Sequence, residues 1–218
     1  MCMKTHTTIA AFALASGTFV VPASAHPHVF AEARLDVTIN SARSVESLRH
    51  VWRFDDLFSS TVLLEFDKNS DLILDAAELT EVATTIHGSL AEYNYFQLVM
   101  SGGKDVKMVP PAKLTAGFDV DKLTIQFETR PEMPLPLGGG NLSVGVYDPT
   151  FYTAIDFVDD ASIVVARFPD GCTRDVVRPD PNQAIARNQG TLTDAFFSDP
   201  TGTDLSKIFA TRLELNCK

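Results

Sequence analysis

Basic side chains are scarce in this sequence. Of its 218 residues, 18 are Lys or Arg and 28 are Asp or Glu, which gives a formal net charge of −10. A protein that binds nucleic acid neutralises phosphates with clustered Lys and Arg, so this composition excludes DNA and RNA as partners. A negatively charged surface favours cations as ligands instead.

Catalytic signatures and long apolar runs are missing as well. The sequence has no glycine-rich nucleotide loop, no H-E-x-x-H pair and no G-x-S-x-G turn around a serine. After residue 25 no apolar run is long enough to span a bilayer as a helix. We therefore expect a binding or transport accessory protein, not an enzyme, and no membrane-spanning helix in the mature chain.

The first 25 residues have the pattern of a secretory signal peptide. Lys4 gives a positive start, an uncharged and mostly apolar run follows from Thr8 to Val21, and Ala23-Ser24-Ala25 supplies small residues for cleavage. A retained N-terminal anchor is the alternative, but the run is short for a bilayer span. We predict that residues 1–25 are removed and that residues 26–218 form one periplasmic domain.

Cysteine is rare, with three residues in the chain. Cys2 leaves with the signal peptide, and Cys172 and Cys217 remain as a pair in an oxidising compartment. Such a pair predicts a disulfide. A pair of thiolate metal ligands is the alternative.

The hydrophobic pattern predicts an α+β fold, mostly an antiparallel β-sheet or sandwich with an inserted helix pair. Apolar residues alternate with polar ones over residues 29–39 and again at Leu48, His50, Trp52 and Phe54, which is the period of half-buried strands. We expect these two runs to form an antiparallel hairpin. Because His50 shares a face with Trp52, we interpret it as a core histidine with its hydrogen bonds satisfied.

The period changes to a helical one in residues 55–94. We predict helices over residues 55–66 and 76–92, the first with Asp55 or Asp56 near its N-cap, on either side of an acidic loop. Further strands are expected over residues 95–100, 106–109, 123–127, 142–147, 154–158 and 163–168. Residues 178–190 are predicted to be a loop, and residues 205–215 a short helix or strand.

The acidic loop from Asp67 to Glu78 resembles a twelve-residue EF-hand calcium loop. Its oxygen donors fall at loop positions 1, 3, 5, 7, 9 and 12: Asp67, Asn69, Asp71, the Ile73 carbonyl, Asp75 and Glu78. Leu72 occupies position 6, where glycine is usual, and a left-handed backbone there costs about 1–2 kcal/mol. We therefore expect weakened calcium binding, with a structural role favoured over a sensor role. A degenerate loop that has lost the ion is the alternative.

The segment His26-Pro27-His28 starts the mature chain if cleavage follows Ala25. The α-amine and imidazole of His26, together with the imidazole of His28, suit zinc, nickel or copper. Asp148 is a candidate carboxylate ligand, although an Asx-turn role is equally compatible with the following proline. His87 lies beside an apolar helix stripe and is interpreted as structural. The alternative for the N-terminus is a solvated end that happens to hold two histidines.

The order of these motifs resembles that of a family of bacterial periplasmic proteins known as domain of unknown function 1007. The matching segments are His26–Phe30, Trp52–Asp55, Asp67–Glu78, Tyr95-Phe96, Tyr147–Thr150 with Tyr152, and the pair Cys172 and Cys217. Members of that family are encoded beside, or fused to, nickel/cobalt-type membrane transporters, and some are implicated in zinc acquisition. The resemblance implies a periplasmic metal-binding accessory protein of an inner-membrane transporter for zinc, nickel or cobalt.

Two copper proteins are alternatives because each also begins with histidine. One is a periplasmic copper-binding protein, which the absence of methionine-rich stretches disfavours. The other is a histidine-brace copper oxidase, which needs a second histidine far along the chain. His50 and His87 are the only histidines available for that position.

Overall fold

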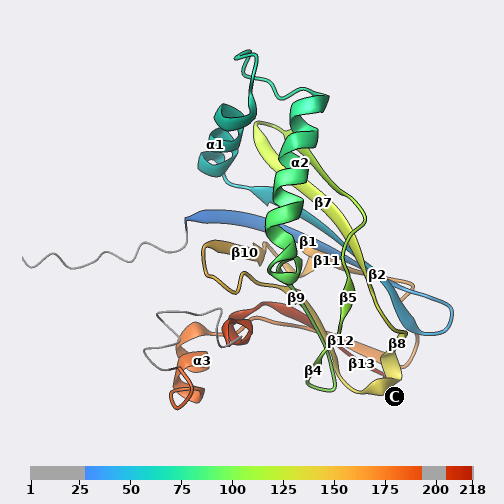
Figure 1. Ribbon diagram of the computed structural model, residues 1–218. Helices are drawn as coiled ribbons and strands as arrows, with labels where there is room; N and C mark the ends of the chain where they lie inside the picture. Colours follow the sequence, from blue (N-terminus) through green and yellow to red (C-terminus); the bar gives the residue numbers. More distant parts are fainter. Residues whose placement is uncertain (1–27, 193–204, 218) are drawn as a thin grey trace, which may run out of the picture.

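The structure is a computed structural model that describes residues 28–192 and 205–217. The predicted signal peptide and His26 lie outside the described residues. Figure 1 shows a pair of helices at the top, a second β-sheet at the bottom and the long strands of the first sheet between them. The predicted α+β fold with an inserted helix pair is confirmed.

The first sheet is built on a long hairpin at the start of the described chain. β1 (Val29–Ile39) and β2 (Ser44–Phe54) pair in antiparallel register from Ala31 opposite Phe54 to Ile39 opposite Val45. The odd-numbered side chains of β1 are buried and the even-numbered ones are exposed or half-buried. The period-two pattern of the sequence therefore gives the hairpin that it predicts.

Strands from the rest of the chain complete this sheet on both sides of the hairpin. β7 (Lys122–Pro131) pairs with β2, and β10 (Thr153–Phe157) and β11 (Ile163–Ala166) pair with β1. The pairs of β1 with β10 and β11 are parallel, so the sheet is mixed. Short antiparallel partners are β5 (Met108–Val109) and β6 (Leu114–Asp119) on β7, and β8 (Leu135–Pro136) on β2.

The second sheet has five antiparallel strands in the order β12-β13-β9-β3-β4. They are β12 (Cys172–Val177), β13 (Arg212–Cys217), β9 (Leu142–Val146), β3 (Gln97–Ser101) and β4 (Lys104–Asp105). Gly145 permits the close approach of β9 and β13, because a Cβ atom at this position would lie 2.4 Å from the Thr211 carbonyl oxygen.

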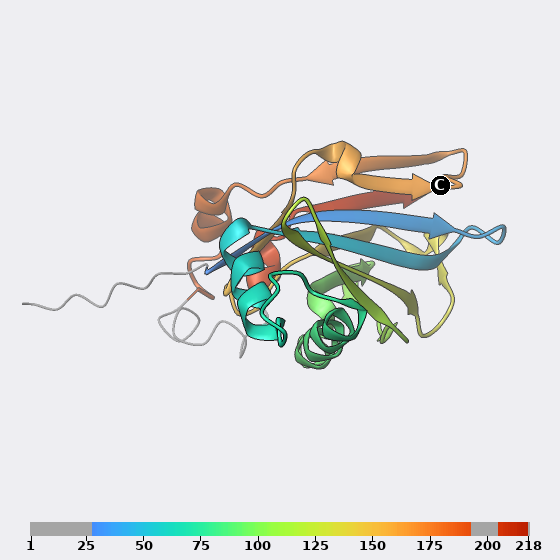
Figure 2. The same ribbon diagram turned by 90° about the horizontal axis from the view of Figure 1, so that it is seen from above.

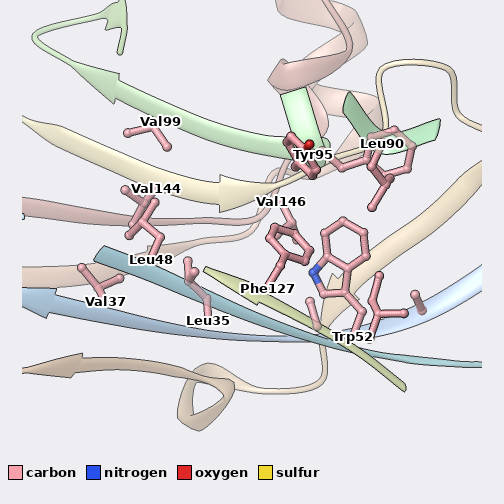
Figure 3. Close-up of a cluster of buried hydrophobic side chains, with 14 of the residues drawn as sticks. Leu35, Val37, Leu48, Trp52, Leu90, Tyr95, Val99, Phe127, Val144 and Val146 are labelled. Carbon is pink, nitrogen blue, oxygen red and sulfur yellow. The ribbon is translucent and has the colours of Figure 1, made fainter. Parts of the chain in front are cut away.

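The core lies between the two sheets and continues under the helices. Figure 3 shows Leu35, Val37 and Leu48 of the first sheet facing Val99 and Val144 of the second. All five side chains are buried. Further along the same face of the first sheet, Trp52 and Phe127 pack below Tyr95 and Leu90 (Figure 3).

The helical insertion covers the end of the first sheet that the second sheet leaves open. α1 (Asp56–Phe66) and α2 (Ala76–Ala91) extend from the β1–β2 hairpin toward the same side, as Figure 2 shows from above. They bury Val62 and Val82 toward the strands. After α2, three consecutive residues, Asn94 to Phe96, hold positive φ angles of 49°, 55° and 52° in a short 3₁₀ turn, η1.

Several sequence expectations need correction. The region 178–190, expected as a loop, contains α3 (Pro181–Arg187), which Asp180 caps by accepting from the Gln183 amide. Residues 205–215 form both expected elements in turn, a 3₁₀ helix η5 (Ser206–Phe209) and then β13. The strands β4, β6, β8 and β12 were not expected. The strand expected over residues 95–100 begins at Gln97, because Tyr95 and Phe96 lie in η1 with positive φ. Two further 3₁₀ turns are η2 (Leu137–Gly139) and η3 (Asp160–Ser162).

His50 also departs from its expectation. The side chain is completely buried, as expected for a core histidine. However, neither ring nitrogen has a hydrogen-bond partner among the residues that the structure describes. The ring is stacked on Phe127 with a centroid separation of 4.7 Å and lies edge-on to Trp52. Burial lowers the pKa of His50 to about 3, so the ring is neutral at physiological pH.

The predicted disulfide is present. Cys172 and Cys217 lie opposite each other in the β12–β13 ladder, with their Cα atoms 4.1 Å apart. The bond joins the edge strand of the second sheet to its neighbour, and it closes a segment with a sequence separation of 45 residues.

Candidate functional site

The N-terminal histidine segment enters the fold at the start of β1. His28 is exposed, and its backbone amide donates to the Tyr152 carbonyl oxygen at 2.8 Å. The His28 imidazole lies over the Tyr152 ring with a centroid separation of 5.0 Å. His26 lies two residues before this anchor, outside the described residues. His28 is therefore attached to the loop that carries Tyr152.

Asp148 organises that loop. Its Oδ1 accepts from both the amide and the hydroxyl of Thr150, each at 2.7 Å, and its Oδ2 accepts from the Thr153 amide at 2.8 Å. The side chain is buried. Asp148 thus adopts the Asx-turn arrangement and holds the loop next to His28. Thr150 was not singled out from the sequence, although an Asp-Pro-Thr segment is typical of such turns.

A cavity of about 520 Å³ opens beside this loop. Its apolar walls include Phe30, Phe151 and Phe209, and Asp148 contributes to one side. Asp55 also reaches this region, where its Oδ2 accepts from the Phe30 amide at 2.7 Å and its Oδ1 from the Phe58 amide at 2.9 Å. Burial alone would raise the pKa of the Asp55 carboxyl, but these backbone donors outweigh it and hold the pKa below its usual value.

The acidic loop between α1 and α2 holds the backbone shape that its sequence predicts. Leu72 has a φ of 64°, the left-handed conformation expected at the sixth loop position. Asp67 stabilises that turn, because its Oδ2 accepts from the Leu72 amide at 2.8 Å and its Oδ1 from the Asp71 amide at 3.2 Å. Asp71 in turn accepts from the Ile73 amide, and Asn69 donates to Asp71. The loop residues fold around their own backbone.

Glu78 closes the two ends of this loop. Its Oε1 accepts from the Lys68 amide at 2.8 Å and its Oε2 from the Asp75 amide at 2.9 Å, and the side chain is buried. Asp75 accepts from the amides of Ala77 and Glu78, so the pair forms a capping box at the start of α2. The spacing of Asp75 and Glu78 in the sequence is the signal for this role.

The predicted ligand sets do not converge into one metal centre. Within residues 28–192 and 205–217, no three side chains of His, Cys, Asp or Glu are placed to hold a metal ion together. The predicted calcium residues Asp67, Asn69, Asp71, Asp75 and Glu78 lie in one loop, but their side-chain oxygens accept from backbone amides. Their oxygen donors still have the chemistry that calcium selects.

The two remaining histidines lie away from the N-terminus. His50 is enclosed in the core, as described above. His87 on α2 is half-buried, with its Nε2 atom 2.9 Å from the Pro111 carbonyl oxygen and 3.5 Å from the Tyr95 hydroxyl. The interpretation of His87 as a structural residue agrees with these contacts.

Comparisons with known proteins give a matching family, a sequence relative and a structural match. A family model described as "Protein of unknown function (DUF1007)" matches residues 11–217. An uncharacterised protein of Haemophilus influenzae is 20% identical over 218 residues, which cover 99% of this chain and all of that protein. Among solved structures, the AChBP of Bulinus truncatus aligns over 90% of this chain and 89% of its own, at 11% identity and a TM-score of 0.31. That score is too low to indicate a common function.

Proposed function

The chain belongs to the DUF1007 family, and from this premise we propose that it is a periplasmic metal-binding accessory protein of an inner-membrane transporter for a divalent metal. The ion is zinc or nickel, captured by His26 and His28 at the mature N-terminus. The protein binds and delivers the ion and is not an enzyme. The transporter partner follows from the family resemblance alone.

The observation that carries this proposal is the attachment of the N-terminus to the fold. His28 is exposed but fixed at its backbone, because its amide and ring both contact Tyr152. A ligand with a fixed backbone loses less conformational entropy when it binds a metal than one on a free tail. The His26 amine and imidazole lie two residues away in the sequence, and we propose that these three donors bind one ion.

One further feature supports the periplasmic setting. The disulfide between Cys172 and Cys217 belongs in an oxidising compartment. Within the described part of the chain, no helix has the length and apolar character needed to cross a membrane.

The positions of the other histidines favour this function over a histidine-brace copper oxidase. A brace needs a second imidazole beside the N-terminal one. His50 is buried between Phe127 and Trp52, and His87 contacts Pro111 and Tyr95. A copper-binding role without oxidase chemistry is the second candidate for the same two histidines.

The test is metal binding by residues 26–218 with an authentic N-terminal His26. Isothermal titration with zinc, nickel and copper is expected to give about one ion per chain, and the ion bound most tightly identifies the cargo. The variant with both His26→Ala and His28→Ala is expected to lose this binding. His87→Gln removes one imidazole elsewhere and serves as the matched control. Equal stoichiometry in the double variant and in the native protein would disprove the proposal.

We propose calcium as a second, structural ion for the acidic loop. Support comes from the oxygen donors and from the left-handed turn at Leu72, which match the pattern of a calcium loop. Binding requires Glu78 to exchange its backbone amides for the ion. A rise in melting temperature at millimolar calcium, lost in Asp67→Asn, is the expected result. No shift in the native protein contradicts it.

A further inference from the structure

A second cavity lies between the helical insertion and the first sheet. Its volume is about 350 Å³, it is partly open to solvent, and it is lined by residues of both helices, of the strands below them and by Tyr152. The walls are largely apolar and aromatic, with Trp52, Phe54, Phe58, Phe66 and Phe96 among them. Its volume and its mostly apolar lining are those of a small-molecule binding pocket.

The charge of the side chains that line the cavity indicates which charge a bound molecule would carry. Glu65 on α1 is the one charged side chain among the described residues that line the cavity, and neither Lys, Arg nor His is among them. Glu65 is exposed, and its carboxylate makes no ion pair within the described part of the chain. A carboxylate beside an apolar cavity attracts a cationic head group and repels an anionic one.

Two of the hydroxyl groups that the helices contribute to the lining are already hydrogen-bonded, so these two do not make the cavity polar. The Thr61 hydroxyl donates to the Leu57 carbonyl oxygen, and the Ser89 hydroxyl donates to the Thr85 carbonyl oxygen. Both hydroxyls are therefore used within their own helices. The nitrogen-bearing edge of Trp52 is turned toward Phe127 (Figure 3), so the indole gives the cavity an aromatic wall.

We propose that the cavity beneath α1 and α2 binds a cationic amphiphile, a molecule with an apolar hydrocarbon group and a positively charged head. The hydrocarbon lies between the helices and the strands, against Trp52 and the phenylalanine side chains. The head group lies at Glu65. This site shares Tyr152 with the anchor of His28, but its test does not depend on metal binding.

The sequence provides a built-in probe for this site, because Trp52 is the only tryptophan in the chain. The experiment follows Trp52 fluorescence while dodecylammonium, dodecanol or dodecyl sulfate is added below its micelle concentration. Dodecylammonium is expected to change the emission saturably and to bind more tightly than dodecyl sulfate by about fivefold or more. Isothermal titration of the same three probes detects binding to which the fluorescence does not respond.

Two variants test the role of the carboxylate. Glu65→Gln is expected to weaken dodecylammonium binding about threefold and leave dodecanol unchanged. Glu92→Gln removes the same charge from the C-cap of α2, outside the cavity lining, and is expected to change neither. Ser89→Phe, which adds a ring to the lining, is expected to reduce binding of all apolar probes. The proposal fails if no probe gives heat or a fluorescence change, if all three bind equally, or if the two glutamine variants behave alike.

Discussion

The buried imidazole of His50 carries a cost at the scale of a single residue. A polar atom that leaves water without gaining a hydrogen bond costs about 1–3 kcal/mol, and both His50 nitrogens are in this position among the described residues. Stacking on Phe127 recovers part of that cost. The side chain is neutral in the folded protein because burial lowers its pKa to about 3.

We predict that His50→Phe stabilises the protein. At pH 7 the free energy of unfolding is expected to rise by about 1–2 kcal/mol, since a ring of similar size replaces two unpartnered nitrogens. Urea unfolding followed by circular dichroism measures the change. An unchanged or lower stability shows that His50 has a partner or a packing role that Phe cannot supply.

The same variant tests the pH dependence. Between pH 6.5 and about 3 the unfolded His50 binds a proton that the folded one does not, so the native protein loses stability as the pH falls through this window. The slope from this group is about 1.4 kcal/mol per pH unit. His50→Phe is expected to have a flatter profile than the native protein. Equal slopes in the native protein and His50→Phe contradict the assignment.

Asp55 stabilises the junction between β1 and α1. It caps the helix through the Phe58 amide and holds the Phe30 amide with its other oxygen. Asp55→Ala is therefore expected to lower the free energy of unfolding by about 1–3 kcal/mol at pH 7. Asp56→Ala, which loses an exposed first-turn acid, is the control and is expected to cost less than about 1 kcal/mol.

Because the pKa of Asp55 is lowered in the folded protein, the stability difference between the native protein and Asp55→Ala is expected to depend on pH. Its folded pKa is depressed, so its stabilisation is present above the unfolded pKa and is lost as the pH falls through the folded value. The difference between the native protein and Asp55→Ala is expected to shrink in acid. A difference that does not depend on pH argues against an ionised cap.

At the scale of elements, the acidic loop between α1 and α2 has a strained backbone at Leu72 in the folded chain. Leu72 already holds the left-handed conformation, and its amide is bound by Asp67. The free-energy cost of the left-handed backbone at Leu72 therefore lowers the stability of the fold. Calcium binding does not have to supply that free energy again, so this strain alone does not weaken the calcium affinity. The exposed Leu72 side chain contributes little packing.

The variant Leu72→Gly separates the effect of the backbone strain on folding stability from its effect on calcium binding. The substitution is expected to raise the free energy of unfolding by about 0.5–1 kcal/mol, because glycine adopts positive φ without steric penalty. Thermal unfolding measures this change, and repeating it with millimolar calcium is expected to give the same shift in the native protein and the variant. A larger calcium shift in Leu72→Gly would mean that the leucine hinders the ion directly.

Elements with a strong local signal were predictable from the sequence. The alternation of residues 29–39 gave β1, and Asp55, one of the two predicted candidates, is the N-cap of α1. α3 was missed although Asp180 and Pro181 are a cap and a first-turn proline, because the apolar periodicity after them is short. The parallel pairing of β1 with β10 and β11 joins segments more than a hundred residues apart, and no local pattern encodes it.

The candidate site also has features that the sequence predicts and features that depend on tertiary contacts. The anchoring role of Tyr152 and the amide contacts of Glu78 depend on tertiary geometry. The oxygen-rich loop was visible from residue types alone. His50 was predicted to be in the core, but its lack of partners depends on what β7 presents opposite it, namely Phe127. Residue spacing thus identified the candidate side chains, and tertiary packing determines which of them have hydrogen-bond partners.

At the scale of the whole molecule, the disulfide is expected to be the strongest single constraint on the C-terminal half. Replacing both Cys172 and Cys217 with Ser is expected to lower the free energy of unfolding by about 2–4 kcal/mol. Urea unfolding with and without dithiothreitol measures the loss. The reductant is expected to bring the native protein to the stability of the variant and to leave the variant unchanged. Equal midpoints for native and variant proteins without reductant contradict this.

The parallel pairing of β1 also sets an order of events during biogenesis. A chain emerges with its N-terminus first, so β1 and β2 can form their hairpin early, while the other edge of β1 waits for β10 and β11. Until residue 166 has emerged, that edge presents unpaired amides and carbonyls to other chains. Long-range pairing of this kind slows folding. The chain is therefore most prone to aggregation during synthesis, when its first half is complete and residues 153–166 have not yet emerged.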